Sequence, residues 1–167
     1  MSTVVPGRFS AEIDESFVVF LIGMRVHNIW AVNKWLPTVR AMSPMLNTLH
    51  QYPDKGFLGQ ESFFRFSPLC TIMMTYWKSF EHLEYFARNT DDPHLEPWRA
   101  FNKSIGNDGS VGIWHETYLI GAGQSESIYV NMPVFGLAAA TRHVPSVGRK
   151  ETARRRLGGY NSPAIPN

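Results

Sequence analysis

Apolar and polar positions follow two different periods between residues 17 and 90, and each period predicts a different element. Phe17–Val26 is dense in β-branched and aromatic residues, which is typical of a strand. Apolar residues then recur at helical spacing between Val32 and Leu49, which predicts a helix. Pro44 lies inside this pattern and should kink or break the helix, because proline removes one of the helical hydrogen bonds.

Residues 58–105 also contain predicted strands followed by predicted helices. Leu58–Phe66 and Leu69–Lys78 are predicted to be antiparallel strands, joined at Ser67-Pro68. Ser79 is a suitable N-cap for a helix over residues 80–88. Asp92-Pro93 indicates a further helix start, with an apolar stripe that continues to residue 105.

Val111–Ile120 is predicted to be the last strand of this region. The order strand, helix, strand, strand, helices, strand is that of the ferredoxin-like split βαβ arrangement, an α+β fold with an antiparallel sheet. Its helices cover one face of the sheet. Three strands here carry adjacent apolar residues and so are apolar on both faces, namely Leu21 and Ile22, Met73 and Met74, and Ile113 and Trp114. We therefore expect a homodimer with facing sheets, and a pocket between each sheet and its helices.

Composition and charge divide the chain into three parts. We expect a flexible N-terminal arm over residues 1–16, a domain over residues 17–140 and a basic, extended tail over residues 141–167. Residues 149–156 of the tail carry five cations and one acid, and without them the totals of 16 basic and 14 acidic residues become 11 and 13. The domain itself is thus nearly neutral, so we expect a solvated end and no nucleic-acid partner.

The sequence lacks the patterns that would predict a membrane span or a signal peptide. The longest apolar run, Val18–Met24, is about a third of a membrane span, and no basic segment followed by an apolar stretch opens the chain. Neither a membrane span nor a signal peptide is expected. The single cysteine, Cys70, excludes an internal disulfide and fits a cytoplasmic location. Within an apolar strand it is expected to fill the core.

The last strand carries the candidate chemistry. We assign catalytic roles to His115, Glu116 and Tyr118, with Trp114 shaping the cavity. A buried titratable group beside aromatic side chains is where pKa values shift, so His115 is a candidate general base or axial ligand. The alternative is a hydrogen-bonded core histidine. Because side chains alternate along a strand, Glu116 and Tyr118 should lie on the face opposite His115.

Further binding candidates lie on other segments. Arg25 could bind a carboxylate of an acidic substrate or a haem propionate, or instead pair with Glu61 or Glu116. Tyr129 and Asn131 alternate to the same side and could reach a ligand or the dimer partner, although packing is the simpler role. Trp77 is expected to shape the cavity.

Three stretches resemble the monooxygenase-like family, formerly a domain of unknown function, of the dimeric α+β barrel superfamily. They are Val19–Trp35 with Gly23-Met24-Arg25 and the following Lys34-Trp35-Leu36-Pro37, Tyr76–Leu83 (YWKSFEHL), and Gly112–Tyr118 with Asn131-Met132-Pro133. The resemblance spans most of residues 17–140 and implies a dimeric ferredoxin-like barrel. The superfamily includes cofactor-free monooxygenases, haem enzymes and redox-neutral lyases and cyclases, and so does not decide the reaction.

The resemblance also allows one comparison with haem-degrading members. Trp77 matches their tryptophan on the third strand, and His94 is the best match to their axial histidine, with His115 as the alternative. The separation of Trp77 and His94 is longer here, and Met24 stands near the position of their asparagine. His94 could equally be a surface histidine near a helix start.

These observations favour an oxidoreductase that modifies a hydrophobic small molecule, a monooxygenase of secondary metabolism. Its cofactor is either none or haem. The first alternative is a haem enzyme, either a dehydratase, a peroxidase-like enzyme or an oxygenase. The others are a redox-neutral lyase or cyclase and a non-catalytic ligand-binding dimer.

Overall fold

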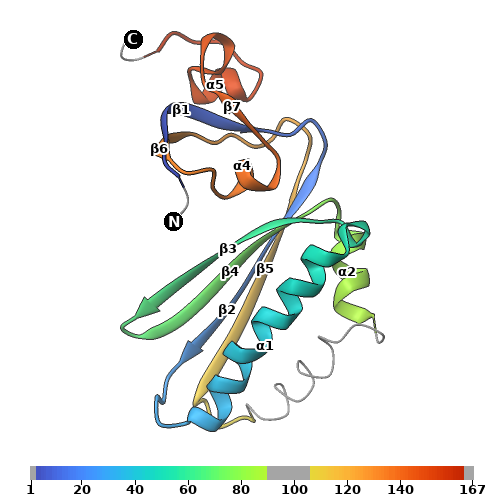
Figure 1. Cartoon of the computed structure of the whole chain (residues 1–167), viewed down its shortest axis with the longest axis vertical. Coiled ribbons are helices and arrows are strands. Elements are labelled where there is room, and N and C mark those ends of the chain that lie inside the picture. Colours follow the sequence, from blue (N-terminus) through green and yellow to red (C-terminus); the bar gives the residue numbers. More distant parts are fainter. Residues whose placement is uncertain (1–2, 90–105, 164–167) are drawn as a thin grey trace.

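A four-stranded antiparallel sheet, called the main sheet below, organises the protein (Figure 1). The computed structural model describes residues 3–89 and 106–163. The main sheet has the strand order β3-β4-β2-β5. Its strands are β2 (Phe17–Val26), β3 (Phe57–Phe66), β4 (Leu69–Trp77) and β5 (Val111–Ile120). This order, with both β2 and β4 internal, is the ferredoxin-like topology that the sequence predicts.

Two helices pack on one face of the main sheet, called the helix face below; the opposite face is called the far face (Figure 1). They are α1 (Val32–Gln51), followed by the short helix η1 (Pro53–Lys55), and α2 (Phe80–Arg88). The helix α1 continues past Pro44 to Gln51, so the break that proline suggests does not occur. The helix expected to start at Asp92-Pro93 lies outside the described residues.

The start of α2 is set by its capping residue. Ser79 has an extended backbone, and its side chain accepts a hydrogen bond from the backbone N–H of His82 at 3.4 Å. This satisfies one of the donors that a helix leaves unpaired at its start. The cap therefore confirms the helix over Phe80–Arg88 and fixes where the chain leaves β4.

The core of the domain lies between the helix face and the two helices. Its buried members are Val18, Leu49, Phe57, Trp77, Leu83 and Phe86. They come from β2, α1, β3, β4 and α2, so this one cluster joins both helices to three strands. Burying a large apolar side chain contributes about 1.5–3 kcal/mol, so this cluster contributes strongly to the stability of the domain.

A second, three-stranded sheet lies beyond one end of the main sheet (Figure 1). Its strand order is β6-β1-β7, with β1 (Val5–Glu12), β6 (Tyr129–Met132) and β7 (Arg142–Pro145) all antiparallel. The short helix α4 (Leu137–Ala140) packs beside it. The N-terminal segment is thus an ordered central strand rather than the expected flexible arm, because β6 and β7 pair with it from both sides.

The C-terminal segment also differs from expectation, since it folds back through η2 (Gly148–Lys150) and α5 (Ala153–Arg156). Ion pairs hold it in place. They join Arg142 to Glu12 (3.2 Å) and Asp14 (2.8 Å), Lys150 to Glu12, Arg155 to Glu151 (3.1 Å), and Arg156 to Glu126 (2.6 Å). Four cations of the supposed basic tail are therefore neutralised within the molecule. We call this set of ion pairs the terminal clamp.

Candidate functional site

The register of β2 with β5 places the candidate site residues on opposite faces of the main sheet. His115 is paired with Ile22, whereas Trp114 is paired with Gly23 and Glu116 with Leu21. Side chains directly opposite each other on antiparallel strands share a face. His115 therefore lies on the helix face, and Trp114 and Glu116 lie on the far face.

His115 is the one ionisable side chain that the four strands of the main sheet place on the helix face, and all four strands lie within the described residues. Its neighbours on that face are apolar, hydroxyl or amide side chains. The imidazole is exposed, and its centroid lies 5.7 Å from that of the Phe20 ring. An imidazole on an apolar surface can accept a proton from a bound molecule.

Trp77 is buried in the core rather than exposed on a cavity wall. Its ring lies 5.4 Å from those of both Phe57 and Phe86, and only 2% of the residue is exposed. The indole Nε1–H donates to Thr75 Oγ1 at 2.9 Å, and this hydroxyl donates to the backbone oxygen of Phe20 at 3.0 Å. Trp77 is therefore held in one orientation, and its ring is packed between the main sheet and the helices.

Trp114 covers a glycine on the far face. A Cβ atom at Gly23 would come within 2.5 Å of the indole ring of Trp114, which is closer than atoms can approach. Glycine at this position therefore allows the ring to lie flat across β2. The result is a smooth apolar surface in the middle of the far face.

Glu116 and Tyr118 form a pair on the same face. The Tyr118 hydroxyl donates to Glu116 Oε2 at 2.5 Å. This hydrogen bond to a carboxylate favours the neutral phenol and raises the pKa of Tyr118 above its usual value. Both side chains are exposed, and neither can act on a molecule that His115 contacts across the sheet.

Arg25 also lies on the far face, where it is paired with Cys70 and Gly112 across the strands. Neither of its two expected carboxylate partners forms an ion pair with it. Glu61 instead accepts a hydrogen bond from the backbone N–H of Gly136 at 2.8 Å, and Glu116 accepts from Tyr118.

Tyr129 and Asn131 have structural contacts in the small sheet. The Tyr129 hydroxyl accepts from the backbone N–H of Ala138 at 3.3 Å, and Asn131 Oδ1 accepts from the backbone N–H of Gly7 at 2.9 Å. Asn131 has a φ of 51°, a left-handed conformation that asparagine tolerates better than most residues. The packing role is thus the one these contacts support.

Sequence reasoning missed a cluster of polar groups where α4 meets the far face. Tyr76 is only 6% exposed, and burial, reinforced by the nearby Tyr129 and Glu61, raises its pKa to about 12. The hydroxyl groups of Tyr76 and Tyr129 both lie next to Gly136, within 3.5 Å of where a Cβ would stand. Because these residues are far apart in the sequence, no local pattern indicates their proximity.

The described residues do not bring the haem-site candidates His115, Arg25 and Trp77 together around one ligand. His115 and Arg25 lie on opposite faces of the main sheet, so they cannot act as ligand and propionate partner of one haem. Trp77 is covered by Phe57 and Phe86 and offers no face to a porphyrin. His94, the best match to the axial histidine, lies outside the described residues. Separately from haem, no group of three His, Cys, Asp or Glu side chains among the described residues could hold a metal ion.

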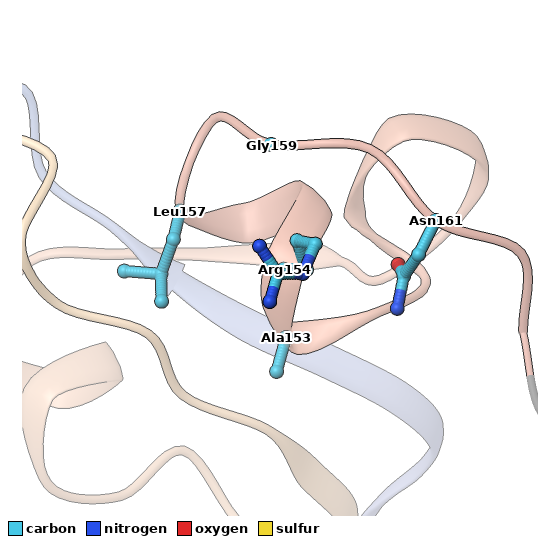
Figure 2. A pocket seen from close by; sticks show the side chains of 5 residues that line it. All are labelled: Ala153, Arg154, Leu157, Gly159 and Asn161. Carbon is cyan, nitrogen blue, oxygen red and sulfur yellow. The ribbon is translucent and has the colours of Figure 1, made fainter.

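The described part of the chain also has shallow hollows at the terminal clamp, away from the main sheet. One, shown in Figure 2, has a volume of about 460 Å³ and is lined by Ala153, Arg154, Leu157, Gly159 and Asn161. None of the expected site residues lies there. No helix in residues 3–89 or 106–163 is both long and apolar enough to cross a membrane.

The fold defines an α+β protein of the ferredoxin-like class, and comparison with known proteins is more specific. A family model described as "Monooxygenase af470-like" matches residues 17–137. The chain belongs to this family, as the sequence resemblance predicted. Monooxygenase af470 of Aspergillus fumigatus is 27% identical over 149 residues. The match covers 78% of the chain and 53% of that relative, so the chain spans about half of the relative's length.

One solved structure with a TM-score above 0.5 agrees with the fold. Aldoxime dehydratase OxdRE, crystallised with butyraldoxime, superposes with a TM-score of 0.58 at 16% identity, over 80% of this chain and 39% of that chain. SnoaB, a cofactor-independent oxygenase from Streptomyces nogalater, has a TM-score of 0.41 at 12% identity, over 62% of this chain and 91% of that chain. At such identities the likeness concerns the fold alone.

Proposed function

We propose that this protein is a monooxygenase that modifies a hydrophobic small molecule in secondary metabolism, with His115 as its general base. The observation that carries the proposal is the isolation of His115 as the one ionisable side chain of the main sheet on the helix face. Membership of the monooxygenase family supports the reaction class. The apolar neighbours of His115 support a hydrophobic substrate.

The proposed chemistry needs no bound cofactor, because the substrate itself supplies the electrons that reduce oxygen. His115 takes a proton from a carbon that lies next to a carbonyl or phenol group of the substrate, and the resulting carbanion is stabilised by that group. The carbanion reduces molecular oxygen. The carbon and oxygen join as a hydroperoxide, C–OOH. Loss of the second hydrogen of the same CH2 carbon then breaks the O–O bond, so that one oxygen atom stays as a carbonyl and the other leaves as water.

We also propose that the protein acts as a homodimer through the far face of the main sheet. This face carries the flat ring of Trp114 and the exposed ring of Phe63, which is 43% exposed. A second copy of the same sheet is the simplest cover for such a surface. In this arrangement each helix face keeps its own site.

Oxygen uptake tests the proposed reaction. The purified protein should consume oxygen with members of a panel of enolisable polycyclic phenols and quinols. His115→Gln should lower kcat by a factor of about 100 or more, which is typical for loss of a general base. Thr117→Val is the matched control, because it is an isosteric change at the next exposed position of the same strand face and should leave kcat within twofold.

Full oxygen uptake by the His115→Gln variant would contradict the assignment of the base. Tight binding of panel members without oxygen uptake would favour the non-catalytic dimer. Conversion of a panel member without oxygen uptake would favour a lyase or cyclase.

A further inference from the structure

The far face of the main sheet carries its charges in separate rows that run across the strands. The registers of β3, β4, β2 and β5 align one residue from each strand in every row. The first row, called the carboxylate row, is Glu61, Met74, Leu21 and Glu116. The next, called the apolar row, is Phe63, Ile72, Gly23 and Trp114. The third, called the arginine row, is Arg65, Cys70, Arg25 and Gly112.

The apolar row lies midway between the two charged rows. Neighbouring rows are two residues apart along each strand, which corresponds to about 6.7 Å. The carboxylate row and the arginine row therefore lie at equal distances on opposite sides of the apolar row. This spacing gives the far face a pattern that is complementary to itself.

The charged side chains have no ion-pair partner among the described residues. Glu61 accepts from a backbone N–H, and Glu116 accepts from a tyrosine hydroxyl. Arg65 donates through Nε to the backbone oxygen of Ser67 at 3.0 Å, and Arg25 forms no ion pair with a described carboxylate. Both arginines are exposed. Glu116 is exposed as well, whereas Glu61 is half-buried beside Gly136. None of the four has an ionic partner among the described residues, so a second copy could supply one.

Two simple symmetries would place two copies of the main sheet face to face. With a two-fold axis along the strands, each charged row would face its own copy, and like charges would meet. With a two-fold axis along the apolar row, the carboxylate row would face the arginine row of the other copy. Like charges brought together repel and opposite charges attract, so the pattern favours the second symmetry.

We propose that the far face binds a second copy of this chain with the two-fold axis along the apolar row. Glu61 then faces Arg65 of the partner subunit, and Glu116, which lies over the partner subunit's Gly112, reaches Arg25 of the partner subunit on the adjacent strand. This inference rests on the proposed dimer and adds its register. An isologous interface forms each contact twice, which gives four ion pairs around one apolar strip. The strip supplies the buried area, and the charges set the orientation.

Sedimentation velocity with charge-reversal variants tests the register. Arg25→Glu should weaken the dimer at least tenfold, and so should Glu116→Arg. The double variant Arg25→Glu with Glu116→Arg should return the dimer Kd to within threefold of the unmodified protein, because the exchanged charges attract again. Both side chains are exposed, so the reversals should leave the monomer folded, which circular dichroism checks. Arg88→Glu, on the exposed surface of α2, is the control and should change nothing.

The outcomes separate this proposal from the enzymatic one. If Arg25→Glu tightened the dimer, the axis would lie along the strands and the proposed register would be wrong. A double variant as weak as the single ones would also overturn it. A monomeric unmodified protein would overturn the dimer altogether, while oxygen uptake would still report independently on the reaction.

Discussion

The indole ring of Trp114 lies across Gly23 of the neighbouring strand, at a distance that leaves no room for a Cβ. This contact flattens the far face of the main sheet, and a single methyl group tests it. Gly23→Ala should push the ring away from β2 and destabilise the domain by about 1–3 kcal/mol, the usual cost of overpacking. The free energy of unfolding in urea measures the loss, and near-ultraviolet circular dichroism reports the moved indole. Gly112→Ala, on the same face of β5, is the control, because an added Cβ would meet only the end of the His27 side chain at 3.3 Å. An unchanged dichroism spectrum of Gly23→Ala would contradict the contact.

Tyr76 should make the protein less stable at alkaline pH. Its pKa of about 12 in the folded state lies above the ordinary value of 10.0, because burial disfavours the phenolate. The neutral phenol is therefore stabilising up to about pH 10, and this stability is lost as the pH rises from 10 to 12. A shift of this size corresponds to about 3 kcal/mol at most. Unfolding free energies at pH 9 and pH 11.5 should show a smaller loss for Tyr76→Phe. Tyr85→Phe, at a tyrosine that is 66% exposed, should lose as much as the unmodified protein.

Glu12 should contribute stability at neutral pH that disappears in acid. Its hydrogen bond to Lys150, with a further contribution from Arg142, lowers its pKa below the ordinary value of 4.5. A carboxylate with a lowered pKa stabilises the folded state above its unfolded pKa, and the effect is lost as the pH falls through the folded pKa. The free energy of unfolding should therefore fall below pH 4.5 by more in the unmodified protein than in Glu12→Gln. Equal losses in both proteins would show that the terminal clamp adds nothing.

Trp77 should be required for folding stability more than for chemistry. Trp77→Leu removes ring contacts with Phe57 and Phe86 and the hydrogen bond to Thr75. We expect a loss of about 2–4 kcal/mol, in the range that large-to-small core changes produce. Tm and urea unfolding measure it. At a temperature where the variant is folded, kcat should remain within a few fold. A stable variant with abolished turnover would instead place Trp77 in the reaction.

Haem titration checks the cofactor. The cofactor-free proposal predicts that haemin gives no saturable Soret shift, and because His115 and Arg25 lie on opposite faces, no shift can depend on both residues at one haem. His115→Ala and Arg25→Ala should thus leave the absorption spectrum of the haemin mixture unchanged. A stoichiometric shift that is lost in His94→Ala would overturn the cofactor-free proposal and make the protein a haem enzyme.

The main sheet could be predicted because each of its strands has a recognisable local pattern of apolar residues. That His115 and Glu116 lie on opposite faces follows from the alternation of side chains along a strand. The small sheet could not, because β1 finds its partners more than 100 residues later, as in the hydrogen bond from Ala11 to Ser127. Few apolar residues mark β1, so its sequence resembles that of a loose arm. Trp77 shows the same difficulty within the candidate site. An aromatic residue in a strand fits a cavity wall or a core equally well, and only the position of Phe86 on α2 decides between them.

The terminal clamp makes the two ends of the chain electrostatically dependent on each other. Glu12 and Asp14 at the end of β1 rely on Arg142 and Lys150 for their counter-charges. Removing the C-terminal segment would therefore leave the carboxylates near the end of β1 without counter-charges, and they would repel one another. The same truncation would remove β7, the neighbour of β1 in the small sheet. A truncated form should consequently fail first at its opposite end, with protease cleavage appearing around residues 5–16.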